Sequence, residues 1–121
     1  LAVDGARSIS AHVSHSYLDG ACLYFTFVGT TSTRDINSAS TDEHEALYLA
    51  IWNVAQRAAL DAGGNLAHHH GVGLNRGRFM RQAMGSAFDV LVAMKQALDP
   101  HDLLNPGKLG LPTTRGKVKY S

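Results

Sequence analysis

Residues 9–28 read ISAHVSHSYLDGACLYFTFV, and this stretch decides the fold. From Ile9 to Tyr17 the odd-numbered residues alternate with serine and histidine at the even-numbered positions. This period of two indicates a strand with one apolar and one polar face. Residues 18–20, Leu-Asp-Gly, are typical of a turn, and residues 21–28 are rich in aromatic and β-branched side chains. Because a short connection favours antiparallel pairing, the sequence predicts a β-hairpin.

The two faces of the second strand carry different side chains. Leu23, Phe25 and Phe27 point to one side and are expected to belong to the core. Tyr24 and Cys22 lie on the other, mixed side, which could line a cleft. Tyr24 is therefore a candidate functional residue, although a tyrosine with its hydroxyl at a sheet edge is also common.

A helix is predicted after residues 29–40, which are a flexible loop by composition. Ser40 and Glu43 have the spacing of a capping box, in which each side chain bonds the other's backbone N–H. Apolar residues then recur at helical spacing from Leu47 to Ala62, and Gly63-Gly64 is a typical helix end.

A second helical stripe runs from Met80 to Leu98, with a break expected near Gly85 and an end at Asp99-Pro100. A tight turn follows over residues 103–108. The order of strands followed by helices predicts an α+β fold, an antiparallel β-hairpin with helices packed on one face. We expect residues 1–121 to form a single segment with one core.

Composition narrows the function classes. The chain of 121 residues has a net charge of +1 and a single cysteine, Cys22, so an internal disulfide is impossible. No apolar run is long enough to cross a bilayer, and we therefore expect a cytoplasmic protein. Eight of its eleven basic residues lie from Arg76 onward. This basic C-terminal part of the chain could attract anions, or its charged side chains could form a solvated surface without a binding role. Nucleic-acid binding is not expected, because the arginines are not interleaved with aromatic residues.

The triple histidine His68-His69-His70, followed by Gly71-Val72-Gly73, is the strongest chemical signal in the chain. Histidine exchanges protons near neutral pH, and glycine lets the backbone approach a ligand closely. If the segment is extended, His69 faces away from its two neighbours, so a shared pocket requires a bend at the glycines. A loop that is rich in histidine without a role is the alternative.

A metal site is a second alternative, with His12, His15 and His44 as further ligands. Adjacent histidines rarely converge on one ion, and the chain lacks both H-E-x-x-H and paired cysteines, so we expect no metal. Residues 71–73 also lack the pattern of a phosphate-binding loop. Arg76 is the best candidate to bind a phosphate or carboxylate group, whereas Arg78 and Arg81 are expected to be surface residues.

Three segments resemble a known family of flavoenzymes. Residues 63–73 resemble the histidine-rich segment of the alkyl-dihydroxyacetone-phosphate synthases, and residues 19–25 resemble the strand that carries their active-site tyrosine. Residues 98–108, which end in Asn105-Pro106-Gly107-Lys108, are similar to the closing motif of the wider class of FAD-linked, vanillyl-alcohol oxidase-type enzymes. The similarity extends from about Ser14 to Leu111.

The resemblance implies an enzyme that contains FAD and replaces the acyl chain of acyl-dihydroxyacetone phosphate by a fatty alcohol, without net redox change. It implies that Tyr24 takes part in proton abstraction and that His68, His69 and His70 line the active site. His69 and Asn105 would contact the flavin, and Arg76 the substrate. The family's N-terminal FAD-binding domain is absent from this chain, so we expect the chain alone to be colourless and inactive.

The resemblance leaves other substrates open. Leu74 stands where the animal enzymes carry lysine, and the ending Asn-Pro-Gly-Lys is commoner among bacterial flavin oxidases. An FAD-linked oxidase or dehydrogenase of a hydroxy acid or another alcohol is therefore an alternative, and a histidine-rich metal-binding module is an alternative of another class. The expected partner is a small lipid or hydroxy-acid substrate, and the complete enzyme is expected to be a homo-oligomer that associates peripherally with membranes.

Overall fold

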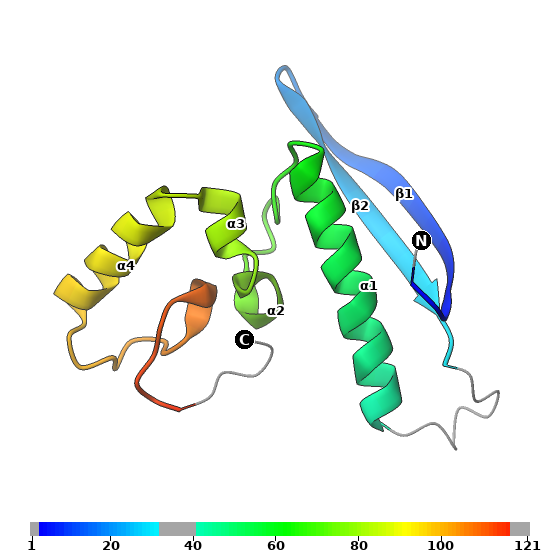
Figure 1. Ribbon diagram of the computed structural model, residues 1–121. Helices are drawn as coiled ribbons and strands as arrows, with labels where there is room; N and C mark the ends of the chain where they lie inside the picture. The colour runs from blue at the N-terminus through cyan, green and yellow to red at the C-terminus, as the bar shows by residue number, and fades with distance from the viewer. Residues whose placement is uncertain (1–2, 32–40, 117–121) are drawn as a thin grey trace. The chain divides into compact units, whose positions relative to one another are not determined.

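The computed structural model describes residues 3–31 and 41–116 (Figure 1). Two compact units make up the chain, Leu1–Ala55 and Gln56–Ser121. The elements in chain order are strands β1 (Ala6–Tyr17) and β2 (Gly20–Gly29), helices α1 (Thr41–Asp61), α2 (Gly73–Gly77), α3 (Met80–Met84) and α4 (Ala87–Leu98), and the 3₁₀ helix η1 (Lys108–Gly110). The expected α+β class is confirmed. None of the helices in the described ranges has both the length and the apolar character that a bilayer span requires.

The first unit is built on the predicted hairpin. β1 and β2 form a two-stranded antiparallel sheet in which Tyr17 pairs with Gly20 across the turn. Both strands extend beyond the predicted ranges at their outer ends, to Ala6 and to Gly29. The alternation of side chains therefore identified the strands, whereas it underestimated their length.

A β-bulge at Ser14 changes which side chains share a face. Val13 pairs with Leu23, but His15 pairs with Cys22, so Ser14 is an extra residue without a cross-strand partner. The extra residue turns His15 and Tyr17 to the face of Tyr24. The predicted period of two, which placed His15 and Tyr17 with Ile9 and Val13, is thus wrong beyond Ser14.

The opposite face of the hairpin carries the apolar side chains, but it is not a core. Leu23 and Phe25 are 51% and 50% exposed, so the prediction that they are core residues is wrong. Burial in this unit occurs at one end of the sheet, where Gly29 leaves room for α1. A methyl group on Gly29 would lie 3.1 Å from Cδ1 of Ile51, which is the buried residue among the described part of this unit.

Helix α1 confirms the predicted apolar repeat and its glycine end. Ser40, the predicted N-cap, lies outside the described residues, while Asp42 and Glu43 occupy the first turn, where the helix dipole favours negative charge. At the other end Gly63 adopts φ 79°, and the N–H of Gly64 donates to the carbonyl of Ala59 at 2.8 Å. This left-handed ending is the one that glycine favours.

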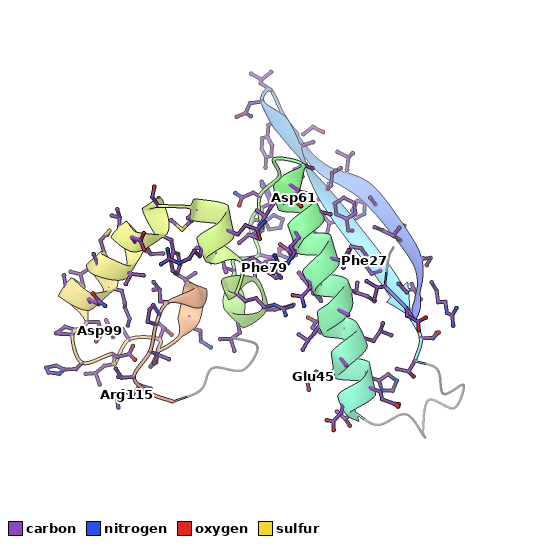
Figure 2. All side chains as sticks on the ribbon, in the orientation of Figure 1. Phe27, Glu45, Asp61, Phe79, Asp99 and Arg115 are labelled. Carbon is purple, nitrogen blue, oxygen red and sulfur yellow. The ribbon has the colours of Figure 1, made fainter. Side chains whose placement is uncertain are left out.

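The core of the second unit joins the segment before the histidines to the later helices. Leu66, Phe79, Met80 and Phe88 are buried together, and Figure 2 labels Phe79 between α2 and α3. The predicted break is confirmed, since α3 ends at Met84 and α4 begins at Ala87. The end of the predicted stripe is not buried, because Met94 and Leu98 are 53% and 77% exposed.

Candidate active site

The three histidines form one contiguous group of rings. The rings of His68 and His69 lie 4.8 Å apart at 87°, and those of His69 and His70 lie 4.4 Å apart at 89°. Nδ1 of His68 is 2.6 Å from Nδ1 of His69, which is a hydrogen-bond distance. The chain turns directly after them, at Gly71 with φ 73°. The bend that a shared pocket would require is therefore present at Gly71.

A cavity of about 390 Å³ lies beside this group within the second unit. His68, Asn65 and Gly71 contribute its polar lining and backbone. Its apolar walls come from Leu66, Ala67, Val72, Met80, Ala83 and Met84. A methyl group added to Gly71 would meet nothing within 4 Å, so the backbone is open to an approaching molecule at this point. The cavity thus combines an imidazole with a mostly apolar lining.

Arg76 lies next to the histidine segment, as predicted. Its guanidinium donates to the carbonyl of Gly71 at 3.4 Å, a long and therefore weak bond. Arg78 donates to both the carbonyl and the side chain of Asn75, and Arg81 forms an ion pair with Asp89 at 2.7 Å. Among these three arginines, Arg76 is the one that contacts the backbone directly after the histidines.

Asn105 lies in a turn with an unusual backbone. The described residues other than glycine that have positive φ are Asp102, Asn105 and Leu109, and all three fall within eight consecutive positions. Each such residue costs roughly 1 kcal/mol or more and persists only where surrounding contacts enforce it. Asparagine and aspartate adopt this region more readily than other residues, so Asp102 and Asn105 are suited to a tight turn.

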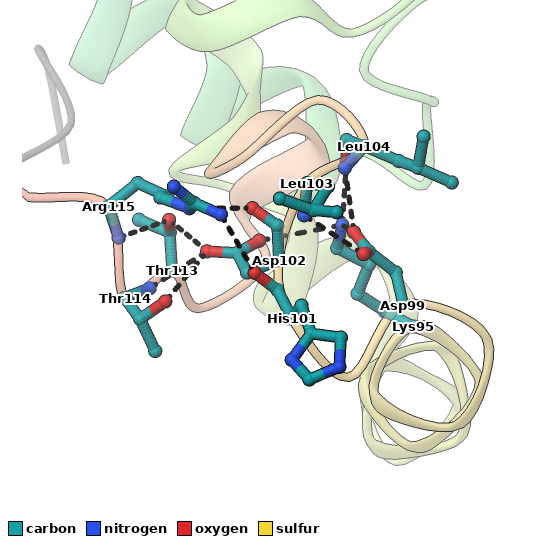
Figure 3. A network of polar contacts seen from close by, with 9 residues as sticks. All are labelled: Lys95, Asp99, His101, Asp102, Leu103, Leu104, Thr113, Thr114 and Arg115. Atoms are coloured by element: carbon teal, nitrogen blue, oxygen red, sulfur yellow. Dashed lines mark hydrogen bonds and ion pairs between the residues drawn. The ribbon is translucent and has the colours of Figure 1, made fainter.

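A polar network surrounds this turn (Figure 3). Lys95 of α4 forms ion pairs with Asp99 and, at 3.5 Å, with Asp102, and it donates to the carbonyl of Leu104 at 2.6 Å. Asp99 accepts the backbone N–H groups of Leu103 and Leu104 at 2.9 and 2.8 Å. We name Lys95, Asp99 and Asp102 the α4 ionic cluster. The backbone groups that Lys95 and Asp99 bind lie directly before Asn105.

Asp102 connects the same cluster to the following segment. Its Oδ2 accepts the hydroxyl of Thr113 and the N–H of Thr114, and Arg115 donates to the carbonyls of Asp102 and His101. Its Oδ1 is buried and accepts no hydrogen bond from the described residues. The ammonium of Lys95 therefore provides the charge that offsets the burial of this oxygen.

Hydrogen bonding explains the acidity of the cluster. The bond from Lys95, with those from the N–H groups of Leu103 and Leu104, lowers the pKa of Asp99 from 3.8 to about 2. The hydroxyl of Thr113 and the N–H of Thr114 lower the pKa of Asp102 in the same way. The hydrogen bond to Asp99 raises the pKa of Lys95. All three groups are therefore charged at neutral pH.

Sequence reasoning did not find this cluster. The spacing of Lys95 and Asp99, four residues apart across a helix end, was a usable signal for the first ion pair. The bonds from Thr113 and Arg115 connect residues that are 11 to 14 positions away, and no local pattern indicates them.

Tyr24 is in the first unit, whereas the histidines are in the second. Its ring stacks on that of His12, its cross-strand partner, with centroids 5.3 Å apart. The bulge places His15 on the same face. That Tyr24 shares a pocket with the histidines stays a prediction.

Comparison with known proteins identifies the family. The model of "FAD linked oxidases, C-terminal domain" matches residues 2–109. The alkyldihydroxyacetonephosphate synthases of Trypanosoma brucei brucei and Dictyostelium discoideum are 37% and 34% identical over 84% and 88% of the chain. The glycolate oxidase subunit GlcD of Bacillus subtilis is 32% identical over 73%.

The chain spans only 15%, 16% and 18% of these three relatives. No solved structure matches it. The expected resemblance to FAD-linked enzymes, with FAD as their cofactor, is confirmed. The chain belongs to the family of FAD linked oxidases, C-terminal domain.

Proposed function

We propose that this chain is the C-terminal domain of a longer FAD-dependent enzyme that replaces the acyl chain of acyl-dihydroxyacetone phosphate by a fatty alcohol. The observation that carries the proposal is the contiguous group of His68, His69 and His70 beside an apolar cavity, within a domain of an FAD-linked family. The identity of 37% to a synthase of that name supports this substrate class.

The chemistry of the cavity fits the ring system of a flavin. Apolar walls suit a flat conjugated ring, and the imidazole of His68 supplies a polar group at its edge. A diphosphate instead needs several backbone N–H groups and cations, which a separate N-terminal domain would provide. His69 and Asn105 would contact the bound cofactor, which supplies the electrophilic ring that the reaction uses.

The histidine pair is suited to hold and pass one proton. Across the 2.6 Å contact one Nδ1 must donate and the other accept, so His68 and His69 together hold one proton between these atoms. The pair can therefore pass a proton from one ring to the other beside the cavity.

Arg76 and Tyr24 complete the proposed set. Arg76, beside the carbonyl of Gly71, would bind the phosphate of the substrate, because a guanidinium pairs well with phosphate oxygens. Tyr24 would accept the proton that leaves the substrate carbon. The cytoplasmic location, membrane association and oligomeric state of the complete enzyme stay predictions.

The test uses the full-length protein that contains this chain. It should bind FAD and transfer a labelled fatty alcohol to acyl-dihydroxyacetone phosphate. His69→Ala should lower turnover at least about a hundredfold, the usual contribution of a proton-transfer group. Tyr24→Phe should do the same, whereas Tyr17→Phe, on the same face of the hairpin, should leave turnover unchanged. A full-length protein that cannot be loaded with flavin would end the proposal.

A second candidate is the FAD-linked oxidation of a hydroxy acid. The identity of 32% to a glycolate oxidase subunit supports it. Arg76 would then bind the carboxylate of the substrate, since carboxylate and phosphate suit the same guanidinium. Anaerobic bleaching of the flavin by a hydroxy acid, with no alcohol exchange, would favour this candidate over the synthase.

A further inference from the structure

The turn that carries Asn105 has no apolar anchor of its own. Leu103 and Leu104, the two residues before Asn105, are 64% and 65% exposed. Burial of their side chains therefore does not fix the backbone here, where Asn105 adopts a left-handed φ of 48°. Some other interaction must hold the turn in this conformation.

The α4 ionic cluster supplies that interaction. Asp99 binds the N–H groups of Leu103 and Leu104, and Lys95 binds the carbonyl of Leu104. Both polar groups of the residue before Asn105 are thus fixed to α4. Because the direction of a side chain follows from the backbone on either side of it, these three bonds determine where the amide of Asn105 points.

The segment after the turn is held as well. Asp102 is bound by Thr113 and Thr114, and η1 contacts α2 through its backbone. A methyl group on Gly110 would lie 2.1 Å from the carbonyl oxygen of Gly77, so the two backbones touch without side chains between them. Because α2 begins at Gly73, shortly after the histidines, this backbone contact joins the segment after the Asn105 turn to the segment after the histidines.

We propose that Lys95, Asp99 and Asp102 are positioning residues, which hold the amide of Asn105 in the direction in which it binds the flavin. The inference deepens the proposed function and rests on it. In this proposal the cluster makes no contact of its own with flavin or substrate. It acts through Asn105, and this separates it from a cluster that only stabilises the fold.

A double-mutant cycle in the full-length flavoprotein tests the inference. The FAD dissociation constant would be measured, from the fluorescence of released flavin, for wild type, Asp99→Asn, Asn105→Ala and the double variant. We expect each single substitution to weaken FAD binding about tenfold, the effect of losing one good hydrogen bond. The double variant should bind FAD no more weakly than Asn105→Ala, because Asp99 has nothing left to position.

Two further variants keep the test decisive. Asp89→Asn breaks an exposed ion pair on the same helix and should leave FAD binding within about twofold of wild type. Thr113→Val removes a single donor to Asp102 and gives a milder form of the cycle if Asp99→Asn does not fold.

Two outcomes would overturn the inference while the proposed function stands. One is a double variant whose loss of affinity equals the product of the two single losses. The other is an Asp99→Asn protein that melts at a lower temperature but binds FAD normally, which would show a purely structural role. A wild-type protein that binds no FAD would instead remove the proposed function, and the inference with it.

Discussion

The hairpin of the first unit and the Asn105 turn of the second are held in opposite ways. β1 and β2 are regular strands whose apolar face is half exposed, with Phe25 at 50%. The turn is irregular, contains left-handed residues and is fixed by buried charge, with Asp99 and Asp102 only 8% and 7% exposed. In these two regions regular structure and burial do not coincide, because the buried carboxylates belong to the irregular turn.

The difference has a physical origin. Cross-strand bonds satisfy the inward-facing backbone polar groups of a strand pair, and these bonds fix its regular geometry. A turn with several positive φ values satisfies few of its own groups, so side chains must bind them.

Removal of a large side chain should have the largest effect in the second unit. Phe88 is 4% exposed, and Phe88→Ala should cost about 3–5 kcal/mol in the free energy of unfolding. Phe25→Ala in the hairpin should cost well under about 1.5 kcal/mol, because half of that side chain is in solvent. Urea denaturation measures both, and equal losses would contradict the contrast.

The backbone contact of the second unit comes next. Gly110→Ala would place a methyl group 2.1 Å from the Gly77 carbonyl oxygen at φ 71°, which should cost about 3 kcal/mol. Gly71→Ala has nearly the same φ, 73°, but meets no atom within 4 Å, so it should cost about 1 kcal/mol. The two variants separate steric overlap from backbone strain, and similar losses would mean that the close approach is relieved cheaply.

The charge of Asp99 should make the turn sensitive to acid. Its pKa in the folded protein, about 2, is below the ordinary 3.8, so its charged form stabilises the fold above about pH 4 and loses this effect as the pH falls toward 2. Asp99→Asn should therefore lower the melting temperature at pH 7, and the difference from wild type should shrink between pH 4 and 2. A difference that is constant over this range would exclude the charge as its source.

The smallest effect is expected at the Arg81–Asp89 ion pair. Its two side chains are 62% and 65% exposed, so water and salt screen the interaction. Asp89→Asn should leave the unfolding midpoint unchanged within error, at low and at moderate ionic strength. A clear loss would show that charge pairs on α4 matter even outside the cluster.

The sequence was sufficient where a pattern repeats locally. Alternation located both strands, and the helical repeat with Gly63-Gly64 located α1 and its end. Ser14 shows the limit, since one extra residue reversed the face of His15 and Tyr17. Alternation predicts that a strand exists, but only pairing decides its register.

The candidate site was predictable in part. His68, His69 and His70 are conspicuous as a run, and their contact depends only on neighbours and on Gly71. The cluster around Asn105 depends on bonds that arise only once the chain has folded back from Thr113 and Arg115. Burial of Leu23 was overestimated, because an apolar face indicates a preference for contact and not the presence of a partner.

The bulge at Ser14 also affects how the hairpin behaves toward copies of itself. A straight strand added along β1 could follow the ladder before Ser14 or the ladder after it, but a single register cannot match both. Exposed apolar hairpins are prone to edge-to-edge growth into fibrils, and an irregular edge interrupts such growth. The extra residue at Ser14 therefore opposes edge-to-edge aggregation of a hairpin with an exposed apolar face, and it does so without a charged residue or a proline at that position.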